Sequence, residues 1–496
     1  MKSLKINALS NVMIKILNIV FPLITGPYIA RVLDKTDYGN FNIANTLINL
    51  FIPIATLGVY NYGIREVSRV IGDRNKINHT FSKLFYVSTF GTIVTTIVYY
   101  IYIFSIYSNI SIKPLCYILG AQIFAQMFYI EWMNEAFENY TFILYKTLFI
   151  RILLFIGLFV FVKKESDVIP YAIIMTVLNS ANFIISFIWI KKNVRLVKVS
   201  FEEIKKLIGP LISVLLLTNA NMMFTILDRA FLSYISTPEY VTFYTIAQNI
   251  ITIISGVILG AITVNVPRMN YYLGNGDEKS YVDLVNITSR IYAFLIIPLS
   301  IGLIMLSSYA MLLYGGSKYI GAGLITGIFS FRIITLSIDV ILGNLIIFAR
   351  GYEKALTINY FIGGFINLIF NFILAYNNII KPELYIITTI FSEYIVWILH
   401  VILIKRKGLF NLKQIFINIA RYIIISLGFV PIYIIYTYFY PIELIIDISN
   451  ILHVFIYIFI CMLYYAVINI CLKDKIIIYC INLIKNLKNK FIINRK

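Results

Sequence analysis

Apolar windows of about 20 residues recur along the whole chain, and this is the length that crosses roughly 30 Å of hydrocarbon as an α-helix. No soluble-looking domain separates them, so the pattern predicts an all-α polytopic membrane protein with about 14 transmembrane helices. The predicted spans are 9–30, 40–61, 84–106, 114–133, 141–162, 168–190, 207–228, 241–264, 285–308, 321–348, 355–375, 383–404, 417–440 and 448–472.

Four of these spans carry polar residues at helical spacing, so that the residues of each set share one helix face. The sets are Asn11, Lys15, Asn18 and Pro22 on the first span; Asn42, Thr46 and Asn49 on the second; Asn221, Thr225 and Asp228 on the seventh; and Thr245, Gln248, Thr252 and Ser255 on the eighth. Polar groups are costly in hydrocarbon, so we expect these faces to line water or protein. Hydrogen bonding between helices in a dry bundle is the alternative.

Ionisable residues inside the later spans are a second group of candidates. Arg332 and Asp339 lie two turns apart on one face of the tenth span, and Glu393 lies in the middle of the twelfth. Intramembrane ionisable residues are functional candidates by default. With Asp228, these three form a predicted ion-coupling set, in which Arg332 sets the charge state of Asp339. The alternative is a structural charge pair that locks two helices together.

The distribution of Lys and Arg residues predicts the orientation of the chain in the membrane. Of the 42 Lys and Arg residues, 28 lie on the two tails and the even-numbered connections, 8 lie on the opposite connections, and 6 lie within spans. Basic loops stay on the cytoplasmic side, so both termini are expected in the cytoplasm. Most of the net charge of +19 is therefore explained by the placement of basic residues on the cytoplasmic side, and no nucleic-acid partner is expected. The predicted location is the bacterial cytoplasmic (inner) membrane.

Composition excludes several other classes of site. The chain is 60% hydrophobic and only 13% charged, where a soluble domain would be roughly a quarter charged. Its four Cys and three His residues show no metal-ligand spacing, so no metal site, disulfide framework or cofactor is expected. The first apolar segment contains Lys15 and is expected to be a retained helix. Trp132 is expected at the membrane interface.

The most highly charged internal connection, Lys191 to Lys206, divides the chain into similar halves. Short matches recur across it at 198 to 215 residues, including Arg31 with Arg229 at the outer ends of the first and seventh spans. We therefore expect an N-terminal lobe of residues 1–200 with spans 1–6 and a C-terminal lobe of 201–405 with spans 7–12. Residues 406–496 add spans 13–14 and a basic cytoplasmic tail.

Several segments together resemble one family. FPLITGPYIARVL, DYGNFNIA and LGVYNYGIREVSR come first, followed by EWMNEAFE, LDRAFLSYISTPEYVTFYTIAQ, IPLSIGL and ARGYEK. They resemble bacterial polysaccharide repeat-unit flippases, the Wzx-type branch of the multidrug/oligosaccharidyl-lipid/polysaccharide exporter superfamily. The resemblance covers about the first 400 residues and departs at Asp34 and Ala136, where the family favours glycine.

The resemblance implies two six-helix lobes around a cavity that opens alternately to each side. It also implies an undecaprenyl-diphosphate-linked oligosaccharide as substrate, with Pro22 and Pro27 kinking the first helix beside the cavity. Arginine and lysine suit phosphate, and amide side chains suit sugar hydroxyls. The expected substrate-binding residues are Lys15, Asn18, Arg31, Asn42, Asn49, Asn221, Arg229 and Gln248.

Two other functions remain open at this point. A drug or cation antiporter of the same superfamily would share the architecture but should have an acidic N-terminal cavity, and no clear mid-membrane carboxylate stands in the first six spans. A membrane polysaccharide polymerase or ligase would be expected to carry a large external loop. The expectation is a non-enzymatic, monomeric transporter, with coupling to a proton or sodium gradient left open and with a polysaccharide polymerase and glycosyltransferases as possible partners.

Overall fold

The computed structural model describes residues 4–105, 111–263 and 265–478, and within these ranges the regular structure is entirely helical. Twelve helices in this part of the chain are long and apolar enough to cross a membrane. Backbone polar groups must be paired inside hydrocarbon, and a helix pairs them within one segment. The predicted all-α, multi-pass membrane architecture is confirmed, and the exact number of 14 spans stays a prediction.

Two predicted spans account for the difference in number. In the fourth window, α5 (Lys113–Ala125) ends early and is followed by a 3₁₀ helix (Gln126–Phe128) and the short α6 (Glu131–Ala136). The eighth window is occupied by α11 (Pro238–Thr263), whose last side chains lie outside the described ones. The fourth apolar window is therefore an interrupted helix, and apolar composition alone did not predict the interruption.

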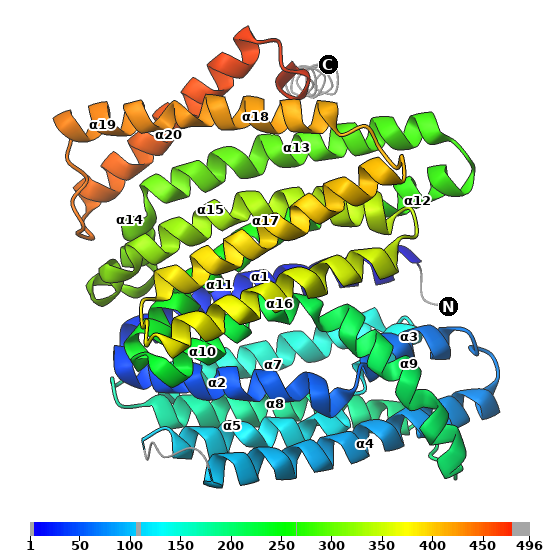
Figure 1. Ribbon diagram of the computed structural model, residues 1–496. Coiled ribbons are helices and arrows are strands. Elements are labelled where there is room, and N and C mark those ends of the chain that lie inside the picture. The colour runs from blue at the N-terminus through cyan, green and yellow to red at the C-terminus, as the bar shows by residue number, and fades with distance from the viewer. Residues whose placement is uncertain (1–3, 106–110, 264, 479–496) are drawn as a thin grey trace, which may run out of the picture. The chain divides into compact units, whose positions relative to one another are not determined.

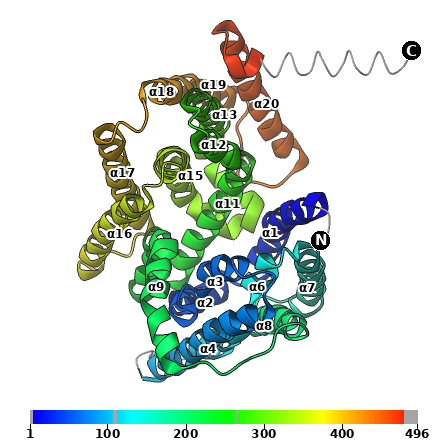
Figure 2. The ribbon, with the colours of Figure 1, turned by 90° about the vertical axis from the view of Figure 1, so that its right-hand side faces the viewer.

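One compact unit contains residues 1–245 and 364–385. Its helices are α1 (Leu4–Val32), α2 (Lys35–Thr56), α3 (Val59–Ser68), α4 (Arg74–Ser105), α5, α6, α7 (Tyr140–Phe161), α8 (Val168–Lys191), α9 (Phe201–Asn219) and α10 (Leu227–Ile235), with a 3₁₀ helix at Ala220–Phe224 and the first part of α11. The end of α16 (Glu353–Tyr376) and the first residues of α17 (Pro382–Arg406) also belong to it. Within this unit α2 packs on α4 and α5, and α7 packs between α1 and α8 (Figures 1 and 2).

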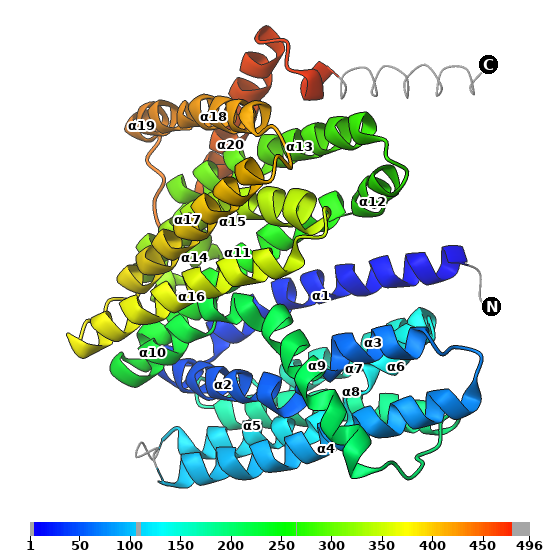
Figure 3. The same cartoon turned by 45° about the vertical axis from the view of Figure 1, so that its right-hand side comes forward.

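The second compact unit contains residues 246–363 and 386–496, of which the structure describes the part up to 478. It holds the rest of α11, α16 and α17, together with α12 (Val266–Gly274), α13 (Glu278–Met305), α14 (Ser307–Gly315), a 3₁₀ helix (Ser317–Ala322), α15 (Gly323–Asp339), a π-helix (Val340–Phe348), α18 (Lys413–Leu427), α19 (Phe429–Phe439) and α20 (Ile448–Cys471). Helix α13 packs against α15 and α18, as Figure 3 shows. The predicted division at residue 200 stays a prediction.

Short polar side chains fix where the helices begin. Asp34 accepts hydrogen bonds from the backbone N–H groups of Thr36 and Asp37 and so caps the N-terminus of α2. Burial opposes the charge of Asp34, but these hydrogen bonds outweigh it and lower the pKa of the carboxyl. At α9, Ser200 and Glu203 form a reciprocal capping box. The position where the family favours glycine is thus used as a helix cap.

The interior of the first unit includes one residue that was expected at the membrane surface. Trp132 is 1% exposed and packs with Phe81 in a core cluster that also contains Val67 and Met133. The prediction that it anchors the chain at the interface is wrong. Its large apolar ring is better buried between helices, a placement that sequence position did not reveal.

Candidate functional site

The polar stripe of α2 points into the interior of the first unit. Asn42 and Thr46 are buried, and the Thr46 hydroxyl donates to the Asn42 carbonyl at 2.7 Å. On α5, buried Gln122 donates to Thr176 of α8 at 3.1 Å and accepts from Asn179 at 3.2 Å. The Gln122 hydrogen bonds therefore connect α5 and α8, whereas the Thr46 bond lies within α2, and the role of the α2 stripe stays a prediction. Asn49, near the end of the same stripe, is half-buried.

The stripe of α1 lies at the surface of its unit. Lys15, Asn18 and Arg31 are exposed, and α1 continues without a break through Pro22 and Pro27. The Asn18 amide oxygen accepts a long hydrogen bond of 3.5 Å from Arg151 of α7. The Arg151 guanidinium also lies 4.8 Å from the ring centre of Phe21. Lys15 and Arg31 thus place two cationic side chains at the exposed surface of this helix.

The turn after α1 packs against the turn before α11. The Lys35 ammonium lies 2.6 Å from Glu239, and the Thr242 hydroxyl donates to the Lys35 carbonyl at 3.2 Å. A side chain at Gly39 would lie 2.1 Å from the Pro238 carbonyl oxygen, so only glycine permits this approach. The segments that carry Arg31 and half-buried Arg229 therefore flank one close contact between equivalent parts of the two predicted halves.

Asp228 is the best-satisfied of the predicted ion-coupling residues. Its carboxylate is fully buried and accepts hydrogen bonds from the Tyr244 hydroxyl at 2.7 Å and from the Asn367 and Asn371 amides at 2.9 and 2.8 Å. The pattern of polar residues had not indicated the two asparagines, although they lie one turn apart on a predicted span. Of the other predicted amides, Gln248 is buried, and the side chain of Asn221 lies outside the described ones.

A buried charged triad in the first unit was also missed. The Lys146 ammonium lies 2.6 Å from both the Glu131 carboxylate and the Ser186 hydroxyl, and Ser186 donates to the same carboxylate at 2.5 Å. Nearby, the Tyr60 hydroxyl donates to Glu135 at 2.5 Å. Carboxylates are therefore present in the interior of this part of the chain, but Glu131 already has its compensating cation.

The remaining predicted ion-coupling residues meet new partners in the second unit. Arg332 of α15 pairs with Glu393 of α17 at 2.6 Å, and Thr335 donates to the other Glu393 oxygen at 3.0 Å. Asp339 accepts a hydrogen bond from Tyr360 at 2.7 Å and lies 3.2 Å from Nδ1 of His400. The structure assigns Arg332 a partner that spacing had not indicated, and the predicted effect of Arg332 on Asp339 stays a prediction.

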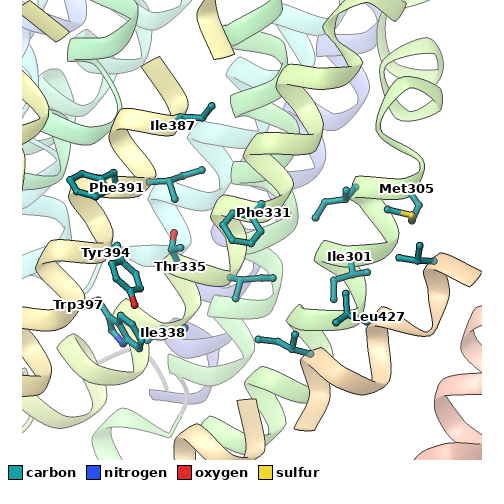
Figure 4. A pocket seen from close by; sticks show the side chains of 15 residues that line it. Ile301, Met305, Phe331, Thr335, Ile338, Ile387, Phe391, Tyr394, Trp397 and Leu427 are labelled. Atoms are coloured by element: carbon teal, nitrogen blue, oxygen red, sulfur yellow. The ribbon is translucent and has the colours of Figure 1, made fainter. Parts of the chain in front are cut away.

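An apolar cavity of about 580 Å³ adjoins this charge pair. It lies among α13, α15, α17, α18 and α19, and Figure 4 shows the rings of Phe331, Phe391, Tyr394 and Trp397 around it. Thr335 also lines the cavity and connects it to Glu393. Such a lining suits hydrocarbon rather than sugar or phosphate. Among the described residues, no three His, Cys, Asp or Glu side chains come together to hold a metal ion.

Residues 4–272 match the model of a protein family described as "Polysaccharide biosynthesis protein". This chain belongs to that family. A relative from Shigella dysenteriae, named "Putative O-antigen transporter", is 21% identical over 366 residues, which cover 72% of this chain and 90% of the relative. The membership confirms the family resemblance found in the sequence segments.

Solved structures share the fold of this polysaccharide biosynthesis family member. The structure titled "Lipid II flippase MurJ, inward closed conformation" gives a TM-score of 0.70 at 14% identity, covering 95% of this chain and all of that one. An inward-facing multidrug resistance transporter of the MATE family gives 0.61 at 13% identity, covering 78% of this chain and 98% of that one. At such identities the likeness shows the fold alone.

Proposed function

We propose that this protein is a flippase that moves undecaprenyl-diphosphate-linked oligosaccharide repeat units across the bacterial cytoplasmic membrane by alternating access. The translocated repeat units would serve capsule, O-antigen or exopolysaccharide assembly. The observation that carries the proposal is membership of the polysaccharide biosynthesis protein family over residues 4–272. The name of the Shigella relative and a fold like that of a lipid II flippase support it.

The chemistry of the substrate agrees with the exposed cations. A diphosphate that crosses a low-dielectric region needs compensating charge, because moving it unpaired costs many kcal/mol. Lys15 and Arg31 are exposed on α1, and half-buried Arg229 lies on α10. In this proposal they bind the diphosphate in turn, while Asn18, Asn42, Asn49, Asn221 and Gln248 serve the sugar hydroxyls.

Orientation and partners are part of the same proposal. The bias of basic residues supports an orientation with both termini in the cytoplasm. A substrate assembled on the cytoplasmic face would then come from glycosyltransferases and pass to a polymerase on the other side. The protein would act as a monomeric transporter that makes and breaks no covalent bond in its substrate.

A drug or cation antiporter is the competing function, and buried Glu131 and half-buried Glu135 are the observation in its favour. Glu131 is already paired with Lys146, and Glu135 accepts a hydrogen bond from Tyr60. An antiporter needs a carboxylate that a cation can reach. Because Lys146 and Tyr60 already bind these two carboxylates, a flippase function is favoured. The flipping assay described below also tests for a polymerase or ligase, because such an enzyme would change the substrate covalently instead of moving it.

The test is flipping of a fluorescent lipid-linked oligosaccharide in liposomes, measured per folded protein. Lys15→Ala, Arg31→Ala and Arg229→Ala should each slow flipping about tenfold, which corresponds to about 1.4 kcal/mol of activation free energy. Lysine at either arginine position should restore part of the rate, because it keeps the charge and loses the bidentate geometry.

Arg195→Ala serves as the matched control, because Arg195 is exposed on a connection outside the proposed path. Wild-type rates in all three alanine variants would eliminate the cationic path. Absence of flipping by the wild-type protein, together with export of an organic cation, would replace the flippase by the antiporter.

A further inference from the structure

Helices α15 and α17 contact each other through two pairs of ionisable side chains, which are separated by the same number of residues on both helices. Arg332 meets Glu393, and seven residues further along each helix Asp339 meets His400. A spacing of seven residues is two helical turns, so the second pair lies on the same faces as the first. All four side chains belong to the second compact unit.

The two pairs differ in their charge. Arg332 and Glu393 cancel each other, and the two nitrogens of Arg332 that contact one Glu393 oxygen lie 3.0 and 2.6 Å from it. Asp339 beside a neutral imidazole leaves one negative charge in a largely buried place. An uncompensated buried charge is expensive, and the addition of one proton to the Asp339–His400 pair removes it.

The surroundings leave His400 as the base that can accept this proton. His400 is fully buried, and among the described residues neither of its ring nitrogens makes a hydrogen bond, although Nδ1 lies 3.2 Å from an Asp339 oxygen. One oxygen of Asp339 accepts from Tyr360 of α16, and the other faces His400. The other titratable and charged groups near the pair are Tyr292 of α13, Glu393 and Arg332. Tyrosine stays neutral at physiological pH, whereas histidine titrates there.

We propose that His400 and Asp339 together bind one proton, and that binding and release of this proton are linked to transport. Proton binding follows from the geometry alone, whereas the link to transport rests on the proposed flippase function. The pair offers one carboxylate, one oxygen of which is already used by Tyr360, and an imidazole. Hard metal cations prefer a larger set of oxygen ligands, so a proton fits this site better than a metal cation.

The backbone beside the pair gives the site its space. A π-helix runs from Val340 to Phe348, directly after Asp339, and π-helical turns are frequent at functional sites. A Cβ at Gly343 would lie 3.1 Å from the Tyr360 hydroxyl and 3.9 Å from the His400 ring. The Tyr281 hydroxyl donates to the Leu345 carbonyl of the same segment at 2.8 Å. Glycine at 343 therefore leaves room for Tyr360 to reach Asp339.

The first experiment measures the proton directly in the full-length protein. The chain has only three histidines, so ¹⁵N-histidine NMR on the His79→Gln/His453→Gln variant reports His400 alone. We expect its ¹⁵N signals to report the uptake of one proton by the Asp339–His400 pair as the pH is lowered through the physiological range. Asp339→Asn should lower its proton affinity at least tenfold, which is one pH unit, because the neighbouring negative charge is lost. Glu443→Gln, an exposed control, should leave the affinity unchanged.

An imidazole that stays in one protonation state over that range would overturn the proposal, as would equal titration in the Asp339→Asn variant. These results do not depend on any transport substrate. Since they use the native His400, they also stand if a substitution at 400 prevents folding.

The second experiment measures the link to transport. Flipping in liposomes is compared with and without an imposed pH gradient, and the ratio of the two rates is the readout. The gradient should accelerate the wild-type protein and His453→Gln several-fold. His400→Gln and Asp339→Asn should give a ratio near one, whatever their basal rates are.

A His400→Gln variant that flips substrate and keeps the wild-type ratio would overturn the link while leaving the flippase function intact. A wild-type protein that moves no lipid-linked oligosaccharide would instead overturn the proposed function, and the NMR titration would still decide on the proton.

Discussion

Asp228 in the first unit and Asp339 in the second have contrasting surroundings. Asp228 is fully buried and receives hydrogen bonds from three neutral donors. Asp339 receives one such bond and faces a histidine. Three neutral donors satisfy a carboxylate without any exchange of protons, whereas a histidine neighbour can take a proton up and release it. The hydrogen-bond partner, more than the carboxylate itself, therefore decides whether an intramembrane aspartate keeps one protonation state or exchanges a proton.

The buried ion pair of Lys146 and Glu131 extends this comparison, and breaking it gives the largest expected effect. Lys146→Met should destabilise the protein by about 3–5 kcal/mol, because Glu131 would be left as an uncompensated buried charge. Thermal unfolding in detergent measures this loss. The double variant Lys146→Met/Glu131→Gln should recover most of it. Lys192→Met, at an exposed position, is the control. A single variant as stable as wild type would show that Glu131 has another source of compensation.

Asp228→Asn tests whether Asp228 is fixed by its donors. The asparagine keeps the shape but weakens the bonds from Tyr244, Asn367 and Asn371, and we expect a loss of about 1.5–3 kcal/mol, the range for hydrogen bonds to a charged group. Asp339→Asn loses only one such bond and should cost less. Unfolding temperatures of the two variants, measured side by side, check the order. A larger loss for Asp339→Asn would reverse the comparison.

Asp474 gives a third acid, placed after α20 and outside the spans. Burial opposes its charge, but hydrogen bonds from Arg290, the Ile476 backbone and Tyr422 outweigh burial and lower the pKa of its carboxyl. A lowered pKa means that the stabilisation is present above the unfolded-state value of about 3.9 and is lost as the pH falls through the folded-state value.

Asp474→Asn should therefore destabilise the protein by about 1–2 kcal/mol at pH 7. The difference from wild type should shrink as the pH falls below about 4. Unfolding temperature as a function of pH measures both effects. A difference that stays constant down to acid pH would show that the charge of Asp474 contributes nothing.

The smallest effect on the protein is expected from labelling positions that test the orientation of both units. In a background without the native cysteines, Cys introduced at Asn193 and Asn411 should be labelled only from the cytoplasm, and Cys at Glu443 only from outside. All three positions are exposed. Labelling of position 193 by an impermeant reagent in intact cells would overturn the topology.

The amino-acid sequence was enough to predict the fold class, because an apolar segment in hydrocarbon has to pair its backbone within a helix and is therefore recognisable as a window of about 20 residues. It also determined the family, through short segments such as FPLITGPYIARVL that were readable without coordinates. Tertiary structure alone decided the partners of the buried charges. Glu393 lies 61 residues from Arg332, and His400 lies on α17 while Asp339 ends α15. Such pairs depend on how helices rotate and pack against one another, and periodicity within one helix contains no information about its neighbour.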